Sequence, residues 1–384
     1  MLPAFSFVTA SDIRFGRGEA RRAVPELAAL GERILLVTGA EASRSDWLVE
    51  ALAERGVALG SFSFPGEPDL ARVEAGIDHA RAFDAQAVIA IGGGAALDGG
   101  KAIAALAPAP RPAMDHLEVV GKGLPLEVPT LPFAALPTTA GTGTEVTRNA
   151  VISVPEARRK VSLRDQTMLP DLAIVDPALT DSCPRGVTLA AGLDAVTQVI
   201  EPYLCTRANP LTDALCRPAI LDGLTALKTL MDGTAEVQEA ARDRMSWVAL
   251  CGGLALANSG LGVIHGLAGP LGGLSGAAHG AICGALLPHG LALNAARSEA
   301  PQTLARIEEL HHWIGQVMDC EAPRSFDRLA GWSRESGLAG LDALGITGED
   351  RAAAAEAAAS SSSMKANPAV LTAPEMLEMM AAAR

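Results

Sequence analysis

The stretch AVIAIGGGAALDGGKAIA, residues 87–104, decides the fold. It opens with an apolar run of the kind that forms a buried strand, and it closes with a helical pattern. Three glycines, residues 92–94, stand where the strand should end and the helix begin. A phosphate can approach backbone N–H groups closely where no Cβ intervenes, and a helix start supplies partial positive charge. The stretch therefore predicts a strand–turn–helix unit that binds a pyrophosphate at residues 92–95.

The glycine turn has a simpler interpretation as well. Its spacing is not the GxGxxG of the common dinucleotide fingerprint, and it follows the third predicted strand instead of the first. Three glycines also serve as a plain tight turn. Asp98 and Lys101 would then be solvated residues of the first helical turn.

The segments around this stretch alternate in the same way. ILLVTG at residues 34–39, SFSF at 61–64 and AVIAI at 87–91 are strand-like runs with helical patterns between them, which predicts parallel βαβ units. After a proline-rich connector at residues 108–132, strand-like pieces recur in FAALPTT, NAVISV, KVSL and LAIVDP. From about residue 184 onward helical patterns dominate. We expect an α/β dinucleotide-binding domain over residues 1–184 and an all-α domain over residues 185–384.

Bulk composition narrows the function classes. The chain has 384 residues, of which 49% are hydrophobic, and its formal net charge is -13. No basic patch stands out, so neither a nucleic acid nor an anionic membrane is expected as a partner. The six cysteines include no CxxC pair, and no signal peptide opens the chain, which favours a cytoplasmic protein with reduced thiols. The apolar residues 250–296 are interrupted by glycines, prolines and histidines, and we expect buried helices there.

Two further stretches carry polar groups that suit a ligand. PTTAGTGTEVT, residues 137–147, could wrap a polar ligand with hydroxyls and amides, although such a composition is usual in ordinary loops. In AAGLDAVTQVIEPY, residues 190–203, Asp194 and Gln198 leave one face of a predicted helix. That spacing suits a metal site, but the second donor is an amide, so a site without that ligand or an ordinary helix also fits.

Six motifs in order are more specific than any of them alone. GGGAALDGGK, PTTAGTGTEVT, LPDLAIVDPALT, AAGLDAVTQVIEPY, GLGVIHGLAGPLGG and AAHGAICGALLPH resemble those of the iron-containing (group III) alcohol dehydrogenases. The resemblance runs from IRFGRG near the N-terminus to SSMKANP near the C-terminus. Relatives of that family include glycerol dehydrogenase, maleylacetate reductase and dehydroquinate synthase. The resemblance implies a dehydroquinate synthase-like fold, with cofactor and metal between an α/β domain and a helical domain.

The resemblance also implies which residues contact NAD(P)H. Many members have an acidic residue after the ILLVT-type strand, where it repels a 2′-phosphate, and here that position is Gly39. Ser43 and Arg44 lie nearby and could receive a phosphate, which favours NADP(H) with use of both cofactors open. Arg44 also fits a solvated charge at a helix start. The remaining contacts implied by motif matching are Gly93, Gly94, Ala95, Asp98, Thr138, Thr139, Thr142, Thr147 and Lys160.

The metal ligands implied by the resemblance are Asp194, His265 and His279. Metal-bearing members have a fourth ligand, a histidine, where this chain has Gln198. Three protein ligands with an open position suit zinc, and iron(II) is the alternative. The two histidines would be about 21 Å apart on one straight helix, so we expect the glycines between them to break it. A second departure is Gly269, where many members have another histidine, and its absence leaves space for a bulkier substrate.

These features together predict reversible, metal-assisted hydride transfer between a nicotinamide cofactor and a small alcohol or its carbonyl product. The alternative is metal-independent reduction of an oxo-acid, as in maleylacetate reductases, which Gln198 and Gly269 favour. A dehydroquinate synthase-like lyase needs a cluster of basic residues that the sequence does not show, and a non-catalytic nucleotide-binding protein is the remaining option. A homodimer is expected, because in the family the N-terminal strand, here in FSFVTASDIRF, often pairs between subunits.

Overall fold

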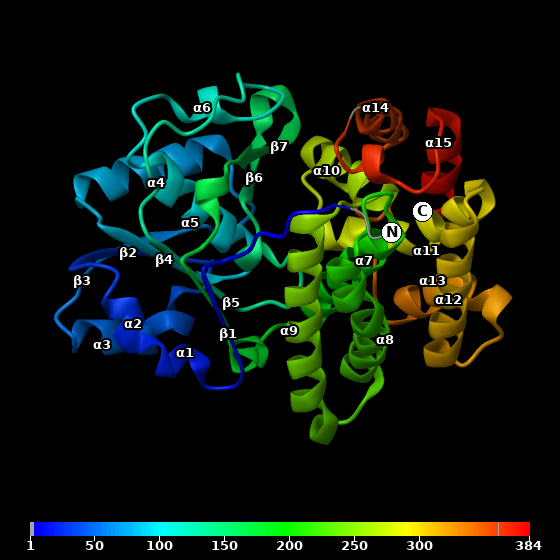
Figure 1. Cartoon of the computed structure of the whole chain (residues 1–384), viewed down its shortest axis with the longest axis horizontal. Helices are drawn as coiled ribbons and strands as arrows, with labels where there is room; N and C mark the ends of the chain where they lie inside the picture. The colour runs from blue at the N-terminus through cyan, green and yellow to red at the C-terminus, as the bar shows by residue number, and fades with distance from the viewer. Residues whose placement is uncertain (1–3, 360) are drawn as a thin grey trace. The chain divides into compact units, whose positions relative to one another are not determined.

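The chain divides into two units, drawn in Figure 1. The structure is a computed structural model that describes residues 4–359 and 361–384. Residues 8–139 and 143–182 form the sheet unit. Residues 183–384, together with residues 4–7 and 140–142, form the helical unit. The predicted fold class, an N-terminal parallel sheet with helices followed by a helical C-terminal part, is confirmed.

A six-stranded parallel sheet lies at the centre of the sheet unit. Its strand order is β1-β8-β5-β4-β2-β3, and every neighbouring pair is parallel. The glycine turn follows the fourth strand and not the third, because residues 12–15 form a strand that pairs with β8. The strands are β1 Asp12–Phe15, β2 Arg33–Thr38, β3 Ala58–Ser63, β4 Ala87–Gly92, β5 Phe133–Pro137 and β8 Leu172–Val175.

Helices cover both faces of this sheet (Figure 1). Alternate residues of β2 enter different cores: Leu35 and Val37 pack with helices α4 and α5, whereas Ile34 and Leu36 pack with α1 to α3. Burial on both faces explains why these strands are continuous apolar runs without polar alternation. The helices are α1 Glu19–Arg22, α2 Val24–Ala28, α3 Asp46–Ala53, α4 Leu70–Ala82, α5 Gly94–Leu106 and α6 Ala113–His116.

The strand-like pieces NAVISV and KVSL are strands but do not join the parallel sheet. They form β6 Asn149–Val154 and β7 Arg159–Arg164, an antiparallel pair in a separate two-stranded sheet. The reason is the length of their connection, which is residues 155–158. A parallel pair needs a crossover of a dozen or more residues, so a connection this short permits only a hairpin.

Helices make up the helical unit. Its core is built from Ala, Leu, Val, Ile and Met side chains of most of these helices, with α7 packed against α8, α9 and α11. Gly192 lets α7 and α8 approach closely, since a Cβ there would lie 2.4 Å from Leu227 Cδ1. The helices are α7 Arg185–Leu204, α8 Pro210–Asp232, α9 Ala235–Asn258, α10 Val263–Ser275, α11 His279–Arg297, α12 Pro301–Met318, α13 Ser325–Glu335, α14 Gly348–Ala358 and α15 Ala373–Ala382.

The apolar region at residues 250–296 forms helices of this unit, as expected. Within the described residues, no helix taken singly has the length and apolarity needed to cross a membrane. Helices α9 and α10 reach that length together, but the chain bends by 96° between them. Most of their apolar side chains are buried in the core of the helical unit.

Candidate active site

Asp194 and Gln198 lie on α7 and are almost fully buried, with 1% and 2% of their surface exposed. The spacing of four residues places both on one face of the helix, as the sequence predicts. The amide Nε2 of Gln198 donates a hydrogen bond of 3.4 Å to the carbonyl oxygen of Gly141. Its Oε1 has no hydrogen-bond partner among the described residues.

His265 and His279 reach the same region from two different helices. His265 is the third residue of α10, and His279 is the first residue of α11. The expectation that several glycines break the intervening chain is wrong in detail, because α10 continues through Gly269 and Pro270 to Ser275. The turn occurs at Gly276, whose φ of 73° lies in the left-handed region that favours glycine. This single turn is enough to bring the second imidazole back.

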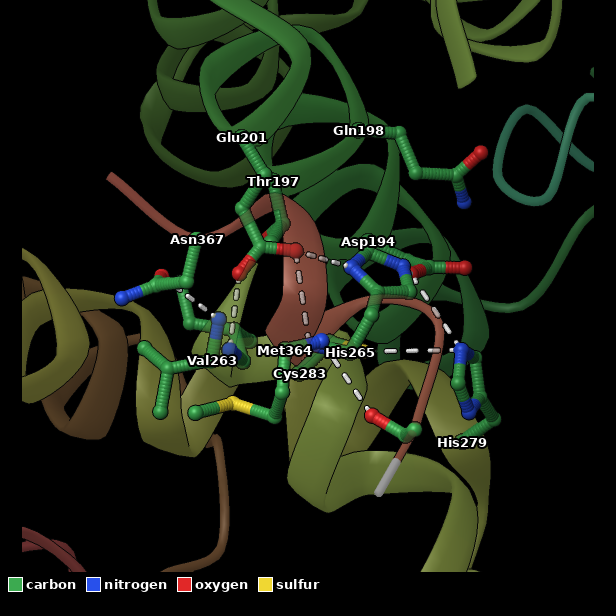
Figure 2. Close-up of polar contacts among 12 residues, drawn as sticks. Asp194, Thr197, Gln198, Glu201, Val263, His265, His279, Cys283, Met364 and Asn367 are labelled. Atoms are coloured by element: carbon green, nitrogen blue, oxygen red, sulfur yellow. Dashed lines mark hydrogen bonds and ion pairs between the residues drawn. The ribbon is translucent and has the colours of Figure 1, made fainter. Parts of the chain in front are cut away.

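The three side chains converge, as Figure 2 shows. Asp194 Oδ1 lies 3.3 Å from His265 Nε2 and 3.8 Å from His279 Nε2. Cys283, one turn further along α11, joins them: its Sγ lies 3.6 Å from His279 Nε2. Ligand atoms of all four residues lie within 4.8 Å of one another. These four donors are close enough together to bind a single cation.

The arrangement of Asp194 and His265 suits a bound cation better than a hydrogen bond between the two side chains. Asp194 Oδ1 and His265 Nε2 are buried and lack a well-formed hydrogen bond within the described part of the chain. Buried polar atoms are nearly always bonded, and leaving one unsatisfied costs about 1–3 kcal/mol. Two ligands placed about 2.0–2.1 Å from one tetrahedral centre are about 3.3–3.4 Å apart. The separation of 3.3 Å between Asp194 and His265 matches that value.

Glu201 holds His265 in position from the far side. Its Oε2 accepts a hydrogen bond of 2.6 Å from His265 Nδ1. A carboxylate at this distance fixes a proton on Nδ1, so Nε2, which faces Asp194, is the ring atom that can bind a cation once it has released its proton. Glu201 also accepts from the backbone N–H of Ile264 at 2.7 Å and of His265 at 3.3 Å, at the start of α10. A carboxylate behind a ligating histidine is the usual second partner in metal sites.

The start of α10 is built to admit this carboxylate. Gly262 precedes the helix, and a Cβ there would lie 2.8 Å from Glu201 Oε1 and 2.8 Å from Asn367 Oδ1. Asn367 Oδ1 accepts from the N–H of Val263 at 3.0 Å. The first three amides of α10 are therefore satisfied by side chains from distant parts of the chain. Negative charge at the helix start is favourable as well.

The side chains of this group shift one another's pKa values towards their charged forms. Burial alone would raise the pKa of Asp194, but His279 and His265 outweigh it and lower the pKa to about 2. Burial alone would lower the pKa of His279, but Cys283 and Asp194 raise it to about 9. The imidazoles therefore neutralise Asp194 when no cation does so. Uptake of a cation then requires the imidazoles to release protons.

The carboxyl ends of β2, β4 and β5 meet at the glycine turn of the sheet unit. A Cβ at Gly92 would lie 3.3 Å from the backbone nitrogen of Gly39, and the N–H of Thr138 donates to the Gly92 carbonyl at 2.9 Å. Gly93 lies against Thr139, and helix α5 begins at Gly94 without a side-chain cap. The chain runs from β2 to β3 on one side and from β4 to β5 on the other, so this is the point where the strand order reverses. Open α/β sheets bind ligands at such points.

Lys101 and Asp98 connect α5 to residues 137–147, the hydroxyl-rich loop, and to the start of β6. The interpretation of Lys101 as a solvated residue is wrong: it is 1% exposed. Its Nζ donates to the carbonyl oxygens of Thr144, Thr147 and Asn149 at 2.5, 2.7 and 3.1 Å. Asp98 accepts a hydrogen bond from the hydroxyl of Thr144 and another from the backbone N–H of residue 151 at 3.0 Å. These contacts fix the shape of the loop beside the glycine turn.

The other residues implied as cofactor contacts lie in different surroundings. Thr147 is buried, and its hydroxyl faces Lys101 Nζ at 3.1 Å. Thr142 belongs to the helical unit and is half-buried. Lys160 lies on β7 and pairs with Glu67. Gly93, Gly94, Ala95, Thr138 and Thr139 are half-buried at the strand ends.

Comparison with known proteins gives the family. The model described as "Iron-containing alcohol dehydrogenase" matches residues 10–177, and that of the family's C-terminal domain matches residues 188–384. The chain belongs to the iron-containing alcohol dehydrogenase family. The resemblance carried by the six motifs is thereby confirmed.

Individual members of this family are similar over most of the chain. Alcohol dehydrogenase 4 of Schizosaccharomyces pombe is 31% identical over 86% of this chain and 77% of its own length. The NAD-dependent methanol dehydrogenase of Bacillus methanolicus is 30% identical over 95% of this chain and 96% of its own. The solved structure of a 1,3-propanediol oxidoreductase covers 100% of both chains, with 27% identity and a TM-score of 0.86.

This membership settles the class of reaction. The chain is an oxidoreductase that acts on CH–OH donors and interconverts alcohols and aldehydes. The family implies a nicotinamide dinucleotide and a metal as cofactors. The alternative of a maleylacetate-reductase-like enzyme is not favoured, because these relatives are named alcohol dehydrogenases.

Sequence reasoning missed two members of the group. Glu201 lies seven residues after Asp194, two helical turns along the same face, and that spacing was the available signal. Cys283 lies four residues after His279 and was grouped only with the buried thiols. Five of the six cysteines are indeed buried and none is in a disulfide, but burial alone did not separate Cys283 from the rest.

Proposed function

We propose that this enzyme transfers hydride between NAD(P)H and a small primary or secondary alcohol or its carbonyl product, with Asp194, His265 and His279 holding a divalent cation. The observation that carries the proposal is the convergence of these side chains, with Asp194 Oδ1 and His265 Nε2 finding no hydrogen-bond partner in residues 4–359 and 361–384. A cation so held polarises the carbonyl oxygen of the substrate, and the nicotinamide supplies the hydride chemistry.

The residues of the chain have separate roles in this proposal. Asp194 supplies the negative charge, and Glu201 fixes the tautomer and direction of His265. The side chain of His279 keeps 32% of its surface exposed, so the group is reachable from the His279 side. Gln198 offers its unpartnered Oε1 as an acceptor for a hydroxyl group, such as that of the alcohol.

Gly269 bears on the size of the substrate. It lies four residues after His265 on α10, and a Cβ at this position would meet no atom of the described residues within 4 Å. Adding a side chain there is therefore sterically free. We propose that this space admits a substrate bulkier than the smallest alcohols.

The proposed cofactor site is the meeting point of β2, β4 and β5. Gly93, Gly94 and Ala95 at the start of α5 would receive the pyrophosphate, because the helix start offers amides without a side-chain cap. Gly39 itself carries no acidic side chain that would oppose a 2′-phosphate, and a Cβ there would meet no described atom within 4 Å. Arg44 pairs with Glu41 at 2.7 Å, which reduces its availability. We therefore propose that NADP(H) is accepted alongside NAD(H).

Elemental analysis combined with a turnover screen tests the proposal. The purified protein should contain about one zinc or iron per chain. It should oxidise members of a panel of primary and secondary alcohols with NAD⁺ or NADP⁺. Chelation should abolish both metal and turnover, and the metal should restore them. Full turnover after complete chelation would refute the metal, and chelator-resistant reduction of an unsaturated oxo-acid would support the maleylacetate-reductase-like alternative.

We also propose an assembly and a cellular location for the enzyme. Strand β1 is an edge of the sheet, and Phe5 before it is 45% exposed. An edge strand offers unpaired backbone groups to a second chain, and we propose a homodimer formed there. Light scattering of the purified protein tests this. The absence of disulfides between described cysteines suits the proposed cytoplasmic location, which cell fractionation tests.

A further inference from the structure

Cys283 belongs to the same group of donors as the three proposed ligands. It follows His279 by one turn of α11, so both side chains leave the same face of that helix. It is 0% exposed, and its Sγ lies 3.6 Å from His279 Nε2. Among the described residues, it is the one cysteine that takes part in a cluster of this kind.

Three of the six donor–donor distances in the group can be compared with those between corners of one tetrahedron. With metal–nitrogen and metal–oxygen bonds of about 2.05 Å and a metal–sulfur bond of about 2.3 Å, tetrahedral geometry separates N from O by about 3.3 Å and S from N by about 3.6 Å. The measured separations are 3.3 and 3.8 Å for oxygen to nitrogen and 3.6 Å for sulfur to nitrogen. All four donor atoms lie within 4.8 Å of one another.

Gln198 does not supply the fourth corner. Its Nε2 is directed to the carbonyl oxygen of Gly141, and an amide oxygen is a weak ligand for zinc or iron(II). A thiolate, by contrast, is a strong and soft ligand that favours zinc. Binding of the cation by Cys283 would release the thiol proton to solvent, with no change of oxidation state.

We propose that Cys283 Sγ is the fourth protein ligand of the cation and makes the site selective for zinc over iron. The inference rests on the proposed function, because it assigns a further ligand to the cation held by Asp194, His265 and His279. Four protein ligands would be compatible with catalysis, because zinc can accept a fifth ligand.

X-ray absorption spectroscopy of the zinc-loaded wild-type protein tests this without relying on turnover. The expected result is one sulfur neighbour at about 2.3 Å together with nitrogen and oxygen neighbours. Cobalt(II) in place of zinc should give a thiolate-to-cobalt charge-transfer band in the near ultraviolet. The band should disappear in Cys283→Ala and in Cys283→Ser. It should persist in Cys216→Ala, a control cysteine on α8 that is also 0% exposed.

Zinc affinity gives the second readout. Titration against a chromophoric chelator should show Cys283→Ala binding zinc more than about 100-fold more weakly, beyond the roughly 10–100-fold range for an outer-shell partner. Its preference for zinc over iron(II) should fall as well. Zinc bound through Asp194 without a sulfur neighbour would overturn the fourth ligand and leave the proposed function intact. No metal binding by the wild-type protein would overturn both.

Discussion

Replacing Glu201 by glutamine tests how the site is oriented. The carboxylate accepts three hydrogen bonds, from the N–H of Ile264 at 2.7 Å, from the N–H of His265 at 3.3 Å and from His265 Nδ1 at 2.6 Å. Glutamine has nearly the same shape but one acceptor oxygen. If that oxygen accepts the hydrogen bonds from the backbone N–H groups at the start of α10, the amide NH₂ group faces the Nδ1–H of His265. Two donors then face each other and no hydrogen bond forms between them.

The conflict has a predictable magnitude. His265 can relieve it by moving its proton to Nε2, the atom that faces Asp194 at 3.3 Å, but that tautomer cannot bind a cation. Loss of such an outer-shell partner weakens metal binding about 10–100-fold, which corresponds to about 1.4–2.7 kcal/mol. The loss of negative charge at the helix start costs about 0.3–1 kcal/mol of stability in addition.

The assay is a zinc titration against a competing chelator, with the wild-type protein and Glu201→Gln compared at the same pH. Asp176→Asn is the matched control. Asp176 is 3% exposed and accepts backbone hydrogen bonds from Ala20 at 3.1 Å and Ala178 at 3.0 Å, all within the sheet unit. The control should lose stability but keep its zinc affinity. A zinc affinity of Glu201→Gln within about twofold of the wild type would refute the orienting role.

The other expectations concern both units. Asp194→Ala and His279→Ala should each abolish metal retention and most turnover, and full turnover of either variant after chelation would contradict the assigned ligands. Burial raises the pKa of Glu145 from 4.5 to about 7. Keeping this carboxyl buried therefore lowers the free energy of unfolding as the pH rises; the loss is absent below pH 4.5 and complete above pH 7. In urea unfolding, the difference in unfolding free energy between Glu145→Gln and the wild type should therefore be up to about 3 kcal/mol more favourable to the variant at pH 8 than at pH 4.5. A difference that does not change with pH would count against this. Gly39→Asp should raise KM for NADP⁺ by roughly tenfold or more and leave KM for NAD⁺ nearly unchanged, because like charges repel; equal effects on both cofactors would argue against a 2′-phosphate near Gly39.

The fold followed from local patterns in the sequence. Apolar runs such as residues 87–91 predict buried strands, and the helical patterns between them predict a parallel sheet. One exception was β1, which joins the parallel sheet beside β8 and makes β4 the fourth strand. The other was the pair β6 and β7, which form a hairpin because their connection is short. That constraint was also present in the sequence, but the strand-like pieces alone did not reveal it.

The sequence also indicated those parts of the candidate site that depend on local spacing. Asp194 and Gln198 share a helix face because of their spacing, and the glycine turn marks the strand end at β4. His265 and His279 were named through family resemblance, because nothing local distinguishes a ligating histidine from a hydrogen-bonded core histidine. The turn at Gly276 that brings them together could not be located among so many glycines.

Only tertiary structure decided which groups meet. The hydrogen bond from His265 Nδ1 to Glu201 spans 64 positions of the chain, and those from Lys101 Nζ to the hydroxyl-rich loop span 43 to 48. Helical and strand periodicities are set by neighbours a few residues apart, so the sequence by itself determined the elements and their buried faces. The partners across elements depend on how those faces pack, which is why Cys283 became visible as a donor only when α11 was seen beside α7 and α10.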